Sequence, residues 1–183
     1  MTTKKTIVWY DIATGSWILE PILEDRVNLQ ILPNNAQEAQ RILQELTPDL
    51  YLTGLLASGQ FERLPHFGEF IKRNEEAAAR LRFHQRGQDY YHLEAGAAAL
   101  VYEVRQQFPQ LPIITISGGV LPELEEMYLT AGATEFHLGD AGADLGKRID
   151  HYLGTKMFNR LHPINNSGRF SSAFDTFCQM LSV

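Results

Sequence analysis

Five apolar segments that alternate with helix-forming segments constrain the fold of this 183-residue chain more than any other feature. The segment LPIITIS (111–117) is an unbroken apolar run, typical of a strand buried on both faces of a sheet. Strands are predicted at residues 6–10, 27–32, 50–52 and 111–117 and, after a turn, within 131–138. Helices are predicted at about 17–24, from a cap at Asn34 or Asn35 through Leu46, at 96–110, from Pro122 to Ala131 and at about 143–153. Such alternation predicts the α/β class, with a five-stranded parallel doubly wound sheet.

Two regions depart from this alternation. Residues 60–94 separate the third strand from the next predicted sheet-covering helix, where two to six residues are usual, and their sequence favours a helical insertion. Residues 1–153 therefore form one domain with this insertion, and residues 154–183 form a C-terminal extension. The extension ends in a short amphipathic segment, SAFDTFCQMLSV, whose apolar face docks on its own domain or on a partner.

Composition excludes several classes of function. The net charge of −6 disfavours nucleic-acid binding, which requires a basic face. The single cysteine, Cys178, cannot form an internal disulfide, which fits a reducing compartment. No apolar run approaches the roughly 18 residues of a membrane span, so we expect a cytoplasmic protein.

The third predicted strand ends without any charge. In PDLYLTGLLASG (48–59), the short strand is followed by glycines and small residues at the end where parallel sheets usually hold ligands. Four segments follow one another in the order found in the receiver domain of bacterial response regulators. They are KTIVWYDI (5–12), PDLYLTGLLASG, LPIITIS and AGATEFHLGD (131–140). The chain resembles that family over about residues 4–60 and 95–153, which implies a flavodoxin-like fold and a role in two-component signal transduction.

The resemblance fails at the positions that carry the chemistry of the family. Asp11 matches one acid of the metal-binding pair, but Tyr10 stands in place of the other. Gly54 stands where the family has the aspartate that accepts a phosphoryl group. Ser117 matches the switch hydroxyl, whereas Gly139 replaces the lysine. The resemblance thus points to a degenerate pocket of Asp11, Gly54, Ser117 and Gly139.

Phosphoryl transfer to a carboxylate needs the carboxylate itself, a hard cation bound by oxygen ligands, and a cationic side chain. Gly54 removes the first, Tyr10 and Gly54 remove metal ligands, and Gly139 removes the third. A slip of one residue would bring Thr53 to the site, but threonine forms no acyl phosphate. We therefore expect a pseudo-receiver with no catalytic residues, no bound metal and no cofactor.

Three candidate features have alternative interpretations. Asp11 either caps the end of a strand or binds a metal, and the loss of its usual partners favours the cap. The segment from Ser117 to Gly119 is either a tight turn or a shallow anion-binding nest. The six histidines show no HxxxH or HExxH spacing, so a metal centre is not indicated.

The sequence therefore predicts a non-enzymatic signalling or regulatory domain that binds other proteins, through residues 60–94 and the C-terminal extension. The resemblance further implies self-association through the last strand and helix. The alternative is a small-molecule or nucleotide binder that uses the crevice bounded by Asp11, Gly54, Ser117 and the insertion, because glycine at positions 54 and 139 opens room there. A DNA-binding regulator is disfavoured, because the residues after the domain are few and not basic.

Overall fold

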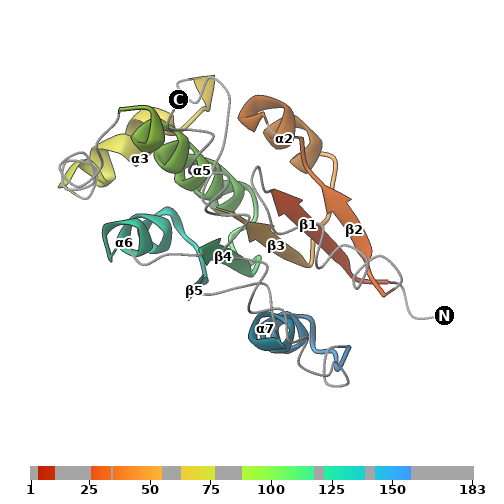
Figure 1. Ribbon diagram of the computed structural model, residues 1–183. Coiled ribbons are helices and arrows are strands. Elements are labelled where there is room, and N and C mark those ends of the chain that lie inside the picture. The colour runs from red at the N-terminus through yellow and green to blue at the C-terminus, as the bar shows by residue number, and fades with distance from the viewer. Residues whose placement is uncertain are drawn as a thin grey trace, which may run out of the picture.

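The computed structural model describes residues 4–10, 26–33, 35–54, 63–76, 88–117, 122–138 and 143–157. Its strands form one parallel sheet in the order β2-β1-β3-β4-β5 (Figure 1). The strands are β1 (Thr6–Tyr10), β2 (Asn28–Ile31), β3 (Leu50–Thr53), β4 (Ile113–Ser117) and β5 (Glu135–Leu138). The predicted α/β class and five-stranded parallel sheet are confirmed.

Helices cover both faces of the sheet (Figure 1). They are α2 (Ala36–Leu43), α3 (Phe67–Arg73), α5 (Gln88–Gln107), α6 (Pro122–Ala131) and α7 (Ala143–Leu153). Helices α2, α5 and α6 share one hydrophobic core with one face of the sheet, and α7 shares a second core with the other face. None of the helices in the described ranges is long and apolar enough to cross a membrane.

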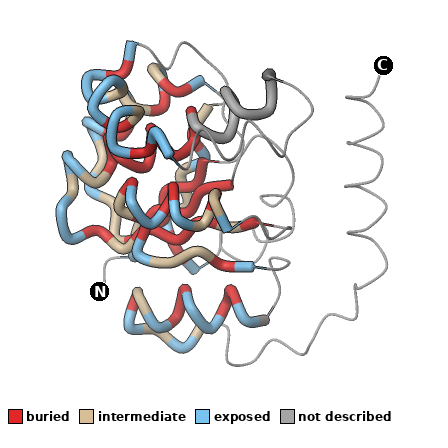
Figure 2. The backbone as a smooth tube through the Cα atoms, turned by 90° about the vertical axis from the view of Figure 1, so that its left-hand side faces the viewer, coloured by how far each residue is buried: buried red, intermediate tan, exposed pale blue. Residues whose placement is uncertain are grey.

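The two cores follow from the alternation of side chains along each strand. Val8 and Tyr10 of β1 belong to the core under α2 and α5, whereas Ile7 and Trp9 belong to the core with α7. Figure 2 shows buried backbone concentrated in the strands between the two helical layers. Both faces of the central strands are therefore inaccessible to solvent, as the apolar runs in the sequence predict.

Helix α2 begins as the sequence predicts. The Asn35 side chain accepts a hydrogen bond from the Glu38 amide at 3.1 Å, which satisfies one of the free amides of the first turn. Ala36, Ala39 and Leu43 are buried, but the helix ends before Leu46, which packs against the core from the following turn. The apolar stripe of α6 is also confirmed, with Leu124, Met127, Tyr128 and Ala131 buried.

Helix α5 differs from its prediction over residues 96–110. It begins at Gln88 and ends at Gln107, so the segment between β3 and this helix ends earlier than residue 94. A glycine inside a helix is intrinsically unfavourable by about 1 kcal/mol, which is why Gly96 reads as a helix start in the sequence. In the structure Gly96 is buried in the helix beside Ala97 and Ala98, and this tertiary packing outweighs its low propensity.

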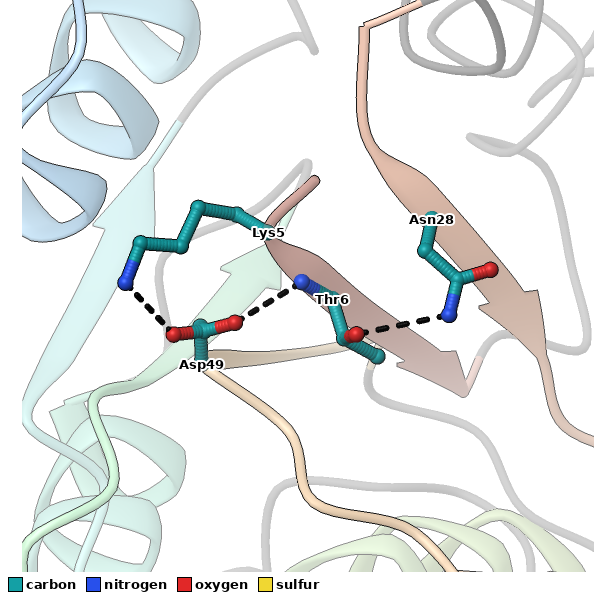
Figure 3. A network of polar contacts seen from close by, with 4 residues as sticks. All are labelled: Lys5, Thr6, Asn28 and Asp49. Atoms are coloured by element: carbon teal, nitrogen blue, oxygen red, sulfur yellow. Dashed lines mark hydrogen bonds and ion pairs between the residues drawn. The ribbon is translucent and has the colours of Figure 1, made fainter. Parts of the chain in front are cut away.

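The amino-terminal edge of the sheet is fixed by Asp49, just before β3 (Figure 3). Its carboxylate accepts hydrogen bonds from Lys5 Nζ at 2.7 Å and from the Thr6 amide at 2.8 Å. Asn28 of β2 donates to the Thr6 hydroxyl at 3.3 Å, which extends the network across three strands. Asp49 thus lies at the end of the sheet opposite to Gly54.

The chain after α7 turns back onto that helix. The buried carboxylate of Asp150 accepts hydrogen bonds from the Thr155 hydroxyl and from the Met157 amide, both at 2.6 Å. Arg26, just before β2, donates to the Met157 carbonyl. The start of the predicted C-terminal extension is therefore attached at the amino-terminal edge of the sheet, while the amphipathic segment of that extension and the helix predicted at 17–24 lie outside the described residues.

Candidate functional site

The carboxyl-terminal edge of a parallel sheet is where ligands usually bind in such folds. In this chain the three central strands end at Tyr10, Thr53 and Ser117. Tyr10 lies in register with Thr53, and Thr53 lies in register with Thr115 of β4. The edge is therefore lined by hydroxyl-bearing side chains rather than by carboxylates in the residues described there.

Gly54 lies at the exit of β3 and is buried. Its amide donates a hydrogen bond to the carbonyl of Tyr10 at 2.9 Å, which continues the pairing of β3 with β1 by one residue. The position is thus firmly held between two strands, and it offers no side chain to a ligand.

Thr53 does not project from the edge. It is fully buried, and its hydroxyl donates to the carbonyl of Gly54 at 3.0 Å. The one-residue slip considered from the sequence would therefore bring a core side chain to the site.

Ser117 lies at the end of β4, in register with Leu138 of β5, and is almost fully buried. The structure therefore places Gly54 and Ser117 at the ends of adjacent strands, as the sequence predicts. Asp11, Gly118, Gly119 and Gly139 lie outside the described residues.

No cluster of three or more histidine, cysteine or acidic side chains that could bind a metal occurs within the described ranges. Of the candidate histidines, His137 lies on β5 and is buried. The Lys147 side chain lowers the pKa of Asp144 on α7. His137 lies in register with Ile116, which packs in the core that contains α7, so His137 lies on the α7 side of the sheet.

The insertion carries a buried acid–imidazole contact that sequence analysis missed. Glu103 of α5 has a side chain that is 3% exposed, and its carboxylate accepts a hydrogen bond from the His66 amide at 2.6 Å. The same carboxylate contacts His66 Nδ1 at 2.8 Å and Gln40 Nε2 of α2 at 3.4 Å. Residues 63–76 are thereby attached to α5 and, through Glu103, to α2.

Aromatic packing supports this junction. Phe70 of α3 is fully buried, and its ring centroid lies 6.0 Å from that of Tyr102 on α5. The Arg73 guanidinium lies over the Tyr102 ring, 5.5 Å from its centroid. The Tyr102 hydroxyl and Arg73 together lower the pKa of Glu69. Helix α3 is short, so these contacts rather than intrinsic propensity hold it in place.

A second surface feature lies over β5 and α7. A shallow depression of about 430 Å³ is lined by Glu135, Asp144, Lys147, Arg148, His151 and Tyr152. Arg148 pairs with Glu135, and the Tyr152 hydroxyl donates to the same carboxylate at 3.1 Å. Burial raises the pKa of Tyr152, and the charge of Glu135 raises it further. Charges of both signs are therefore already paired within this surface.

Comparison with known proteins defines the fold. No protein-family model matches the chain, and no curated protein sequence matches it. Among solved structures, the chain is similar to a CheY-like receiver domain protein from Methanospirillum hungatei, with a TM-score of 0.56 at 18% identity over 83% of this chain and 95% of that one. It is also similar to a two-component response regulator from Clostridium difficile, with a TM-score of 0.55 at 13% identity over 82% and 97% of the two chains.

The BeF3-activated receiver domain of RstA from Klebsiella pneumoniae gives the same result, with a TM-score of 0.55 at 16% identity over 81% and 98% of the two chains. At these low identities the likeness concerns the fold. The chain therefore has the CheY-like, flavodoxin-like architecture of response-regulator receiver domains.

Proposed function

We propose that this chain is a receiver-like regulatory domain that accepts no phosphoryl group, is not an enzyme, and acts by binding other proteins. The observation that carries the proposal is the position of Gly54 at the exit of β3, with its amide bound to the carbonyl of Tyr10. This is the strand end that holds the nucleophilic carboxylate in the family that the sequence resembles. Formation of an acyl phosphate requires such a carboxylate.

Among the residues that the structure describes, the neighbouring groups offer no substitute nucleophile. Thr53 and Thr115 carry hydroxyls, which form no acyl phosphate, and both are fully buried. Asp49, which is close in sequence, lies at the opposite edge of the sheet, where Lys5 and the Thr6 amide occupy its carboxylate. The described part of this edge therefore favours a role without covalent phosphorylation.

The way in which α3 is attached to the domain supports a protein-binding surface on the insertion. Its inner side is attached through Phe70 and Glu103, while Glu69, Lys72 and Arg73 are exposed. A rigidly attached, charged surface outside the five-strand core suits recognition of another protein, because little entropy is lost on binding.

The phosphorylation test uses a small phosphodonor. The protein is incubated with acetyl phosphate and Mg²⁺, alongside a phosphorylatable receiver domain as positive control, and intact mass is measured under conditions that preserve acyl phosphates. We expect the control to gain one phosphoryl group and this chain to gain none. Labelling of an aspartate in this chain would refute the proposal.

The partner surface is tested separately. The protein is cross-linked in its native cell, and captured proteins are compared between the wild type, Lys72→Glu on α3 and Lys147→Glu on α7. Both lysines are exposed, so each variant reverses a charge at the surface, and the Asp144 partner of Lys147 is itself exposed. We expect the α3 variant to lose a reproducible partner that the α7 variant retains, whereas equal capture by all three proteins would argue against the α3 surface.

A further inference from the structure

Helix α3 packs against α5 and does not complete its own amino-terminal end (Figure 1). His66 is the N-cap of α3, and its side chain makes no capping hydrogen bond within the segment that the structure describes. Glu69 stands three residues later, where the acid of a capping box would bond to the N-cap amide. The Glu69 carboxylate instead contacts the Arg73 guanidinium at 2.5 Å. The His66 amide therefore needs an acceptor from outside α3.

Glu103 of α5 supplies that acceptor. Its carboxylate accepts a hydrogen bond from the His66 amide at 2.6 Å and contacts His66 Nδ1 at 2.8 Å. The other end of α3 is closed within its own segment, because the Asn74 side chain donates a hydrogen bond to the Phe70 carbonyl at 2.9 Å. One end of α3 is thus completed locally, and the other end is completed by a different helix.

The ring contacts of α3 fall on the residue before Glu103. The ring centroids of Phe70 and His66 lie 6.0 Å and 6.3 Å from that of Tyr102. Phe70 is the one residue of α3 that is buried, whereas four of the five residues of β1 are buried. A helix of seven residues is too short to be stable in isolation. Helix α3 is therefore helical because it is docked, and less burial holds it than holds the sheet.

We propose that α3 is a detachable unit, which undocks from Tyr102 and Glu103 and unwinds while the five-stranded domain stays folded. The docked state is the major one, and the detached state is a minor population of the native protein. Elements that move in regulation are drawn from such segments of low local stability.

Detachment controls the surface on which the proposed function depends. The exposed charges of α3, such as Lys72, have a fixed arrangement only while the helix is docked. A partner that recognises this arrangement binds the docked state and increases its population. This consequence rests on the proposed function, whereas the detachment itself is tested on the free protein.

The test measures hydrogen exchange of single amides by NMR under native conditions. The Phe70 amide, bonded to the His66 carbonyl at 2.9 Å, and the Asn74 amide, bonded to the Phe70 carbonyl at 3.1 Å, report on α3. The Tyr51 amide, bonded to the Pro112 carbonyl at 3.0 Å, reports on the sheet. We expect Phe70 and Asn74 to share one opening constant, at least about tenfold larger than that of Tyr51.

Ile149→Val separates local opening from global unfolding. Ile149 is fully buried in the core that contains α7, whereas Phe70 belongs to the other core. Loss of one buried methylene lowers the stability of the whole domain. We expect the opening constant of Tyr51 to rise severalfold and those of Phe70 and Asn74 to stay unchanged. An equal rise at all three amides would overturn the proposal, because α3 would then open only with the whole domain.

Glu103→Gln tests the group that holds α3 in place. This variant keeps the shape of the side chain but removes the charge that accepts the His66 amide. We therefore expect the opening constants of Phe70 and Asn74 to rise about thirtyfold. Glu76→Gln, which changes an exposed acid in the segment after α3, is the matched control and should leave both constants unchanged.

Exchange of the α3 amides that is as slow in Glu103→Gln as in Glu76→Gln would contradict the proposal. If Glu103→Gln does not fold, the comparison of the wild type with Ile149→Val decides the question alone. A failure to capture any partner through α3 would count against the proposed function only, because exchange is measured on the free protein.

Discussion

Acidic side chains hold three junctions of this molecule together, whereas the described carboxyl-terminal edge of the sheet has none. Asp49, Glu103 and Asp150 each accept a backbone amide, from Thr6, His66 and Met157 respectively. Each also accepts a second hydrogen bond from a side chain of the same segment or its neighbour. At the exit of β3 the comparable position is Gly54, whose two described hydrogen bonds both use its backbone.

The difference shows what carboxylates do in this chain. A partly or fully buried carboxylate is costly unless donors satisfy it, so each of the three is stable only when its segment is docked. Such an acid attaches one segment to another. A reactive carboxylate must instead stay open to a substrate, and none is described at the edge where the receiver fold would place it.

The largest effect is expected at Glu103. Glu103→Gln keeps the shape but removes the charge that the His66 amide and imidazole stabilise, so we expect a loss of about 2 to 3 kcal/mol in the free energy of unfolding. Urea denaturation measures this. Glu76→Gln, an exposed acid in the segment after α3, is the matched control and should change stability little. An equal loss of stability in both variants would contradict the special role of the buried carboxylate.

Asp150 should come next. Asp150→Asn weakens the contacts with the Thr155 hydroxyl and the Met157 amide, and we expect a loss of about 1 to 2 kcal/mol. The Met157 amide should exchange its hydrogen faster than in the wild type. The amides of β3 should remain as well protected from exchange as they are in the wild type. An unchanged Met157 amide would show that this carboxylate does not hold the segment.

Asp49 is expected to give a smaller effect with a defined pH dependence. Partial burial raises its pKa, but the hydrogen bonds from Lys5 and Thr6 and the Lys5 charge lower it to below the ordinary value. Its stabilising contribution is therefore present above about pH 4 and is lost as the pH falls through the lowered pKa. Because the side chain is one third exposed, we expect Asp49→Asn to cost only about 1 kcal/mol at pH 7.

The acid-dependent part of that prediction is checked by thermal unfolding between pH 7 and pH 2. The difference in Tm between wild type and Asp49→Asn should shrink as the pH falls. A constant difference would mean that the ionised carboxylate is not what holds the strand ends.

The smallest effect is expected at Asp144, which pairs with Lys147 on the exposed side of α7. Asp144→Asn should leave the urea midpoint unchanged within error, because exposed ion pairs are screened by solvent. A clear loss of stability in this variant would show that exposed acids stabilise the fold as much as the acids that join segments.

Much of the fold follows from local patterns in the sequence. Apolar runs predict the strands, and the spacing of Leu124, Met127 and Tyr128 predicts the buried side of α6. The start of α5 could not be predicted from the sequence. The sequence shows the low helix propensity of Gly96, but it does not show the tertiary packing that compensates for it. At the site, the positions of Gly54 and Ser117 could be predicted, because the carboxyl ends of parallel strands lie at the same edge of a sheet.

Glu103 could not be found in this way. In the sequence it is one acid within a helix, and acids in helices are usually exposed. Its partner His66 lies 37 residues earlier, on the far side of the insertion, so no local spacing connects them. The only available signal was its position between Tyr102 and Val104 in a stretch of otherwise apolar residues.

The attachment of Met157 to Asp150 and Arg26 fixes the position of the last residue that the structure describes. Met157 lies at the amino-terminal edge of the sheet, whereas Gly54 lies at the carboxyl-terminal edge. The length of the strands therefore separates these two points, and the central β-sheet is the rigid element that connects them.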